Sequence, residues 1–301
     1  MNFLSLLIAL GVEASLPNCQ TMSSTWCSGC DSLTYYYDYK CFKVCPTACP
    51  INGEYCSCQS SSTVFNLEFA QQTDPSQSQI GDFYTLNNVE FSDPSRVAPI
   101  PTPERGFYFD PSSQLVSRKP YIPGPYSRLV FWTKAKEEGK LLAITENGNP
   151  YYEVSMASGS WHFRTNYLDI QDFNLKEISL SAPCSLGSWG KITFYVYFWW
   201  KNTDRYYEIC TVKIYVDNVE QSHSETNYCW VRHDVDTLGI QSYIGNFGGL
   251  DGFTGFLYRV YLTNSHSDTS ISEDLSDCEF NYYVDNDGSC KQCLGCQTDW
   301  P

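Results

Sequence analysis

The stretch from Ser188 to Ser222 constrains the fold more than any other part of this chain. Its centre, Ile192–Trp200, is a run of β-branched and aromatic residues, and a second run follows at Thr211–Val216. Asp217-Asn218 then provides a turn signal. Alternation with a period of two, together with Asx residues at the bend, predicts a β-hairpin followed by a further turn.

Similar short runs recur along the chain, separated by turn residues at intervals of roughly 8–14 residues, and no long helical periodicity interrupts them. The predicted strands are Val64–Phe69, Gly106–Phe109, Arg128–Thr133, Lys140–Thr145, Tyr151–Met156, Ser160–Arg164, Ile240–Ile244 and Gly255–Leu262. This pattern predicts a mainly β fold, an antiparallel jelly-roll β-sandwich flanked by small disulfide-rich modules.

The charge balance argues against several classes of partner. The chain has 301 residues and a formal net charge of −15, with 19 Lys and Arg residues scattered along it. Nucleic-acid binding needs clustered basic residues, so nucleic acid is not an expected partner. Anionic lipid surfaces would also repel such a chain.

The first residues resemble a secretory signal. Residues 1–14 contain the apolar run Phe3–Leu10, and Val12 and Ala14 suit a cleavage site after Ala14. No other apolar run approaches the roughly 18–20 residues of a transmembrane helix, so no transmembrane segment is expected. The predicted location is secreted or at an extracellular surface.

Fifteen cysteines support an oxidising compartment. They are Cys19, Cys27, Cys30, Cys41, Cys45, Cys49, Cys56, Cys58, Cys184, Cys210, Cys229, Cys278, Cys290, Cys293 and Cys296. Disulfides are expected, but sequence alone does not specify their pairing. Two of the middle three should pair, and the third is a candidate partner for Cys278. The odd total leaves at least one thiol unpaired within the chain, and this thiol could join another molecule.

Several motifs resemble known families. Four stretches are similar, in this order along the chain, to motifs of concanavalin A-like and laminin G-like domains. They are Leu129–Thr133, Ser188–Phe194, Val212–Asn218 and Tyr243–Tyr261. Asn218 stands where those domains usually have Gly, although Asn also tolerates positive φ. This resemblance covers residues 64–266 and implies a lectin-like sandwich.

The cysteine-rich ends resemble a different family. Residues 15–63 resemble furin-like repeats of growth-factor receptors, and residues 267–301 resemble the beginning of a second repeat. Secreted proteins of ciliated protists combine such repeats with a lectin-like domain, and the whole chain resembles that arrangement. The expected organisation is a signal peptide at 1–14, a cysteine-rich module at 15–63, a sandwich at 64–266 and a partial repeat at 267–301.

Alternation divides the central hairpin into two faces. If Ile192, Phe194, Val196 and Phe198 face the core, an outer stripe is left for a ligand. The candidate ligand-binding residues are Tyr195, Tyr197, Trp199 and Tyr215. Aromatic faces suit sugar C–H surfaces and protein anchors. The alternative is that another segment, such as the Pro-rich stretch 92–125, covers this stripe.

Motifs for catalysis and for metals are weak. No strand carries Glu-x-Asp-x-x-Glu, and no Gly-x-Ser-x-Gly elbow occurs, so an enzyme is not predicted. The pair Cys27 and Cys30 lacks the second pair of ligands that a zinc site needs. The resemblance to lectin-like domains implies calcium as a candidate ion, since many relatives bind it with oxygen ligands and acidic residues occur in predicted loops, but no ligands or other cofactors are assigned. Those loop residues are Asp217, Asp234, Asp236 and Asp251.

Two functions remain open from the sequence. The first is a secreted, non-catalytic recognition protein that binds glycans or extracellular proteins. The second is a structural subunit of an extracellular coat or filament, in which the aromatic stripe and the odd cysteine join subunits into a disulfide-linked or non-covalent oligomer.

Overall fold

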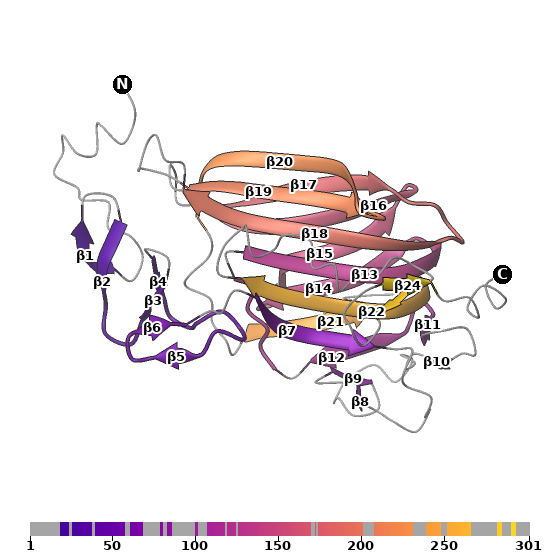
Figure 1. Cartoon of the computed structure of the whole chain (residues 1–301), viewed down its shortest axis with the longest axis horizontal. Coiled ribbons are helices and arrows are strands. Elements are labelled where there is room, and N and C mark those ends of the chain that lie inside the picture. Colours follow the sequence, from indigo (N-terminus) through magenta and orange to yellow (C-terminus); the bar gives the residue numbers. More distant parts are fainter. Residues whose placement is uncertain are drawn as a thin grey trace.

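The structure is a computed structural model, shown in Figure 1. It describes residues 19–23, 26–37, 40–57, 61–68, 79–80, 83–85, 100–101, 107–117, 119–124, 126–169, 172, 174–200, 208–230, 239–247, 252–265, 282–284 and 290–292. Regular structure in these ranges is almost entirely β-strand. Within them, no helix is long and apolar enough to cross a membrane. The predicted signal peptide lies outside the described residues.

The main body is a β-sandwich of two layers. The front sheet runs in the order β10 (Ile100–Pro101), β11 (Phe107–Phe109), β22 (Thr254–Ser265), β13 (Tyr126–Glu137), β18 (Trp189–Trp200), β19 (Glu208–Val216) and β20 (Val219–Trp230), and β7 (Ser61–Glu68) also pairs with β22. The back sheet runs in the order β16 (Ser160–Asp169), β15 (Asn149–Ala157), β14 (Gly139–Glu146), β21 (Ile240–Gly245), β12 (Gln114–Ser117), β9 (Phe83–Thr85) and β8 (Gln79–Ile80), and β17 (Leu175–Pro183) also pairs with β16. Figure 1 shows the two layers overlying one another. The predicted antiparallel sandwich is confirmed.

The two sheets are continuous at one corner. There β20 leaves the front sheet and pairs with β16, through Leu168 opposite Trp230 and Asp169 opposite Cys229. The disulfide between Cys210 and Cys229 fixes β19 to β20 next to this corner. The corner is therefore held by both backbone pairing and a covalent bond.

The predicted central hairpin is present, and β18 pairs with β19 from Ile192–Val216 to Trp200–Glu208. The next turn is a two-residue loop in which Asp217 has φ 49° and Asn218 has φ 64°. Positive φ at both central residues is the requirement of a type I′ hairpin, whose twist matches that of the strands. Asn218 therefore adopts the positive φ for which Gly is usual at this position, as expected from the sequence.

The inner face of this hairpin forms the centre of the core. Ile192, Phe194 and Val196 are each no more than 2% exposed, and Val212 and Ile214 are fully buried. The Phe194 ring stacks on Phe163 of β16 with centroids 4.8 Å apart, so this contact joins the two sheets. The predicted inward alternation is confirmed for these residues, while the side chain of Phe198 lies outside the described residues.

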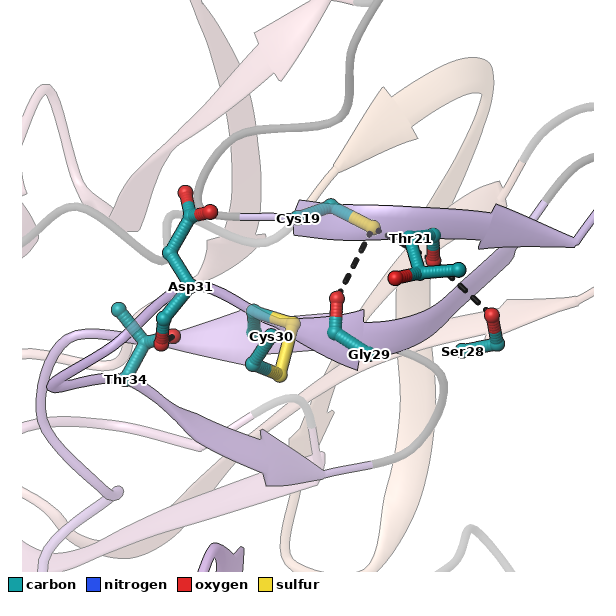
Figure 2. The surroundings of a disulfide bond; sticks show 8 residues. Cys19, Thr21, Ser28, Gly29, Cys30, Asp31 and Thr34 are labelled. Carbon is teal, nitrogen blue, oxygen red and sulfur yellow. Dashed lines mark hydrogen bonds between the residues drawn. A yellow bond between two sulfur atoms is a disulfide. The ribbon is translucent and has the colours of Figure 1, made fainter.

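A small disulfide-rich module precedes the sandwich (Figure 1). It contains β1 (Cys19–Ser23), β2 (Trp26–Cys30), β3 (Tyr35–Tyr37), β4 (Lys40–Phe42), β5 (Ile51–Asn52) and β6 (Tyr55–Cys56). Cys30 is bonded to Cys41 and Cys45 to Cys56, each across 11 positions of sequence. Figure 2 shows the bond at Cys30 beside the β1–β2 pair, where the Ser28 hydroxyl donates to the Thr21 carbonyl at 3.0 Å. Such a short segment buries little apolar surface, so these bonds supply much of its stability.

This module is docked on the sandwich. Phe42 and Cys45 belong to the same buried cluster as Tyr121 and Ile122 of the sandwich. Thr47 also forms two hydrogen bonds with Ile122. The Thr47 N–H donates to the Ile122 carbonyl at 3.0 Å, and the Ile122 N–H donates to Thr47 Oγ1 at 2.7 Å. The module and the sandwich therefore share one core.

Asn264 of β22 completes this contact. Its side chain is 1% exposed, and its Nδ2 donates to the carbonyls of Thr47 at 2.9 Å and Ile122 at 3.1 Å. Its Oδ1 accepts from the Gly124 N–H at 2.8 Å and from Ser127 Oγ at 3.4 Å. One buried amide thus connects the module, the loop at 119–124 and two strands of the front sheet.

The structure specifies part of the cysteine pairing that the sequence left open. Cys210 pairs with Cys229, and Cys184 is a free thiol among the described cysteines. Cys19 and Cys49 are also disulfide-bonded. Cys184 is partly buried, its sulfur lies 3.4 Å from Met156 Sδ, and burial raises its pKa. Its expected candidate partner, Cys278, lies outside the described residues.

Candidate functional site

The outer face of the front sheet carries the aromatic residues that the sequence singled out. Tyr195 and Tyr197 project from β18, and Tyr215 projects from β19, opposite Thr193. We call these three residues the tyrosine platform. All three are partly exposed. The Tyr195 ring stacks against Tyr197 with centroids 5.8 Å apart, and it meets Tyr215 edge-on at 5.2 Å. Because the three rings brace one another, the platform is held in one arrangement.

A carboxylate borders the platform. Glu220 of β20 accepts a hydrogen bond from the Tyr215 hydroxyl at 2.9 Å. It also forms an ion pair with Lys213, whose Nζ lies 3.3 Å away. His223 Nδ1 lies 3.0 Å from the other Glu220 oxygen. The hydrogen bond from Tyr215, with Lys213 beside it, holds the pKa of Glu220 below its ordinary value. Glu220 is thus an oriented, ionised acceptor next to three aromatic rings.

The other half of this face is basic as well as aromatic. We call it the basic half. It comprises Arg128, Trp132, Lys134, Lys136, Lys191, Phe256, Arg259 and Tyr261. Cations and rings alternate across it: Lys191 Nζ lies 5.5 Å from the Trp132 ring centre, and the Arg259 guanidinium lies 5.7 Å from the same ring. Arg259 also lies 4.9 Å from the Tyr261 ring. Such contacts are favourable because the ring face is electron-rich.

The two halves differ sharply in exposure. Lys213, beside the tyrosine platform, has a side chain that is 33% exposed. Lys134 and Lys191, in the basic half, are each 7% exposed, and Arg128 is 6% exposed. Trp132 is also only 7% exposed, and its Nε1 has no hydrogen-bond partner among the residues that the structure describes. The tyrosine platform is therefore accessible, whereas six of the eight residues of the basic half are buried although they lie on the outside of a sheet; Lys136 is exposed and Arg259 partly exposed.

Two further clusters of carboxylates are paired with cations. Arg164 lies 2.8 Å from Glu153 and 3.4 Å from Glu177 on the outer face of the back sheet. Lys176 pairs with both Asp169, at 2.5 Å, and Asp172, at 3.0 Å. A catalytic carboxylic acid needs a raised pKa. The backbone N–H of Asn174 and the Lys176 ammonium instead lower the pKa of Asp172.

The loop acids do not form a recognisable metal site in the part of the chain that the structure describes. There, no group of three or more His, Cys, Asp or Glu side chains could hold a metal ion. Asp217 instead accepts a hydrogen bond from the Lys191 N–H at 2.8 Å, which closes the turn beside the central hairpin. Asp234, Asp236 and Asp251 lie outside the described residues.

Three of the four predicted binding residues come together, and the fourth is not described. Tyr195, Tyr197 and Tyr215 form the platform, whereas the side chain of Trp199 lies outside the described residues. Their binding role stays a prediction. Sequence reasoning did not single out Glu220, which belongs to a polar strand. It also missed the basic half, although Arg128 and Trp132 lie on the outer face of the strand predicted at Arg128–Thr133.

Comparisons with known proteins give only distant likenesses. No family model matches the chain, and no curated protein matches it. Among solved structures, domain 4 of an extracellular arabinanase from Geobacillus stearothermophilus, in complex with arabinotriose, has 10% identity and a TM-score of 0.46, covering 69% of this chain and 94% of that one. An endo-β-1,4-glucuronan lyase from the fungus Trichoderma reesei has 13% identity and a TM-score of 0.41, covering 69% and 98%. The CBM40 of a Ruminococcus gnavus sialidase, bound to α2,3-sialyllactose, has 11% identity and a TM-score of 0.33, covering 50% and 81%. TM-scores this low indicate neither a shared ligand nor a shared activity.

Proposed function

We propose that this chain is a secreted, non-catalytic recognition protein that binds carbohydrate through the tyrosine platform. The observation that carries the proposal is the joint presence of Tyr195, Tyr197 and Tyr215 as braced, partly exposed rings on a rigid sheet. Rings of this kind supply flat apolar surface without much loss of side-chain entropy.

The polar border suits sugar hydroxyl groups. Glu220 offers carboxylate oxygens, and Lys213 offers ammonium protons, both within reach of the Tyr215 ring. A pyranose has an apolar C–H face and a rim of hydroxyl groups, so it would stack on the rings and bond this border. Small-molecule sites combine apolar surface with a few fixed polar groups in the same way.

The paired carboxylates and the disulfides support the other parts of the proposal. Asp172 and Glu220 have lowered pKa values, which suits anions that bind cations or hydroxyl groups rather than proton donors. The disulfide bonds are compatible with an extracellular protein. The coat-subunit alternative gains no support from Cys184, because a partly buried thiol with a raised pKa is a poor linking group.

A glycan array probed with the full chain tests the proposal, followed by titration calorimetry with the best glycan. Removing one stacking ring by Tyr197→Ala is expected to weaken binding by about tenfold. Tyr55→Ala is the matched control, because Tyr55 is an exposed tyrosine of the cysteine-rich module, 57% accessible to solvent. Its affinity should equal that of the natural chain. A flat array, or equal effects of the two substitutions, would overturn the proposal.

Tyr215→Phe separates stacking from hydrogen bonding. It keeps the ring and removes the hydroxyl group that holds Glu220 at 2.9 Å. A smaller loss than that of Tyr197→Ala is expected if stacking dominates. Because the pKa of Glu220 is lowered, its carboxylate stays ionised at mildly acidic pH, so protonation of Glu220 should not weaken binding between about pH 7 and about pH 5.

A further inference from the structure

The cysteine-rich module carries an exposed leucine in a strained turn. Leu33 is 92% exposed, and its φ is 71°. A bulky side chain disfavours this left-handed backbone conformation, which glycine and asparagine adopt far more readily. Leu33 therefore gains neither a buried apolar environment nor a relaxed backbone from its place in the chain. This combination points to a role outside the chain's own fold.

The turn around Leu33 is nonetheless firmly held. The Thr34 N–H donates to the Asp31 carbonyl at 3.2 Å, and the Thr34 hydroxyl donates to the same oxygen at 2.7 Å. Asp31 directly follows Cys30, whose disulfide to Cys41 anchors the start of the turn. Figure 2 shows Asp31 and Thr34 beside this disulfide. Leu33 is therefore presented on a fixed support, which lowers the entropy cost of binding it.

Two more exposed apolar residues lie at the same end of the module's four-stranded sheet. β3 and β6 run parallel with Tyr36 opposite Tyr55, so the turns that precede these strands lie at one end. The Tyr36 N–H also donates to the carbonyl of Glu54, in the second turn, at 2.7 Å. The first turn carries Leu33, and the second follows Ile51 and leads into Tyr55. We call Leu33, Ile51 and Tyr55 the module tip.

The tip concentrates exposed apolar surface. Ile51 is 55% exposed and Tyr55 is 57% exposed, and the Tyr55 ring is braced edge-on by Tyr36 with centroids 5.7 Å apart. In the described part of the chain six large apolar side chains are exposed, and three of them are those of the tip. The module is much the smaller part of the protein. Single exposed apolar residues are ordinary, whereas a group of them marks an interaction surface.

Charge at the tip indicates the kind of partner. Asp31 and Glu54 lie in the two turns, and both are exposed. Neither forms an ion pair with another residue in the described ranges. An acidic rim is complementary to a basic one and repels a like-charged surface. A second acidic tip and an anionic lipid surface are both disfavoured for this reason.

We propose that the module tip is a docking surface for a partner protein that offers an apolar pocket with Lys or Arg side chains at its rim. Leu33 enters the pocket, Ile51 and Tyr55 pack around it, and Asp31 and Glu54 pair with the basic rim. The tip belongs to the module, whereas the tyrosine platform lies on the sandwich. This inference goes beyond carbohydrate binding and does not depend on it.

Selection from a library of short random peptides displayed on phage tests the proposal, with the full disulfide-bonded chain as the target. The enriched peptides are expected to combine apolar or aromatic residues with Lys or Arg. Leu33→Asn removes the apolar side chain but keeps a residue that accepts positive φ, so the turn should stay folded. It should weaken binding of the enriched peptides by about tenfold or more. A selection that enriches no peptides, or only acidic ones, would overturn the proposal.

Leu175→Asn is the matched control, because Leu175 is 54% exposed at the start of β17 in the sandwich. It should leave the affinity for the same peptides unchanged. The double substitution Asp31→Lys with Glu54→Lys should weaken their binding several-fold, and the loss should be smaller at high salt because the charges are exposed. Equal affinities of the Leu33→Asn and Leu175→Asn chains would contradict the proposal.

Other occupants of the tip give different results. A dimer of the natural chain in sedimentation velocity that is lost in the Leu33→Asn chain would reassign the tip to a second copy. Flotation with phosphatidylcholine vesicles that is lost in the same variant would reassign it to lipid. Either result would overturn the proposal. The Leu33→Asn chain should bind glycan as the natural chain does, so failure of carbohydrate binding and failure of docking are separate outcomes.

Discussion

Replacing Asn264 by Ala should destabilise the whole chain, because this one side chain joins the cysteine-rich module to the sandwich. The substitution removes the side-chain acceptor of the buried Gly124 N–H and the donor to the partly buried Thr47 carbonyl. Ser127 and the Ile122 carbonyl keep other partners. A buried group that loses its partner costs about 1–3 kcal/mol, so two such groups give a loss of about 3 kcal/mol.

Urea unfolding of the non-reduced chain, followed by Trp fluorescence, measures this loss as a change in the free energy of unfolding. Asn227→Ala is the matched control, because Asn227 is exposed on β20 and its removal should change stability by no more than about 0.5 kcal/mol. A loss below about 1 kcal/mol for Asn264→Ala, or equal losses for both variants, would refute the role of Asn264.

Asn264→Asp adds a test with a definite sign. The new carboxylate would keep the acceptor for Gly124 and face the carbonyl oxygens of Thr47 and Ile122, which now accept from the amide at 2.9 and 3.1 Å. Burial and these oxygens favour the neutral acid, so its folded pKa should rise above the unfolded value of about 3.9. The folded state then binds more protons than the unfolded state. The loss of unfolding free energy relative to the natural chain should therefore become smaller as pH falls through the raised pKa. A deficit that does not change between about pH 7 and about pH 4 would contradict this reasoning.

Two further changes test the core and the corner of the sandwich. Phe194→Ala removes a ring that is fully buried against Phe163, so it should lower the free energy of unfolding in urea by about 3–5 kcal/mol. A loss near zero would mean that the two sheets do not meet there. Replacing both Cys210 and Cys229 by Ser opens a loop across 19 positions and should cost about 3 kcal/mol, and an unchanged unfolding midpoint would show that the corner is held by backbone pairing alone.

Sequence reasoning predicted the strands that have one apolar face and one polar face. The run at Ile192–Trp200 and the turn at Asp217-Asn218 were found because period-two alternation and Asx residues are local signals. Six strands of the sandwich were not predicted, and they are β8, β9, β10, β12, β17 and β20. In β17 only Ile178, Leu180 and Ala182 are buried, and the rest of the strand is exposed, so its apolar signal is short. These strands form because neighbours supply hydrogen-bond partners, which is tertiary information.

The candidate site was predictable only in its aromatic part. Alternation along β18 placed Tyr195 and Tyr197 on the outer face, and the structure agrees. Glu220 became part of the site only because the two-residue turn folds β20 back on β19, with Tyr215 opposite Glu220. The role of Asn264 could not be predicted, because its partners lie 140 and 217 positions away in the sequence.

The pairing of β7 with β22 determines the order in which this protein can fold. Asn66 of β7 accepts a hydrogen bond from Arg259 at 3.0 Å, across 193 positions of sequence. By contrast, Cys30 and Cys41 are only 11 positions apart. The Cys30–Cys41 bond can therefore form while synthesis continues, whereas β7 cannot pair with β22 until almost the whole sandwich has been synthesised. Such distant contacts slow folding. For this chain, the unpaired β7 strand is the segment most exposed to aggregation during synthesis.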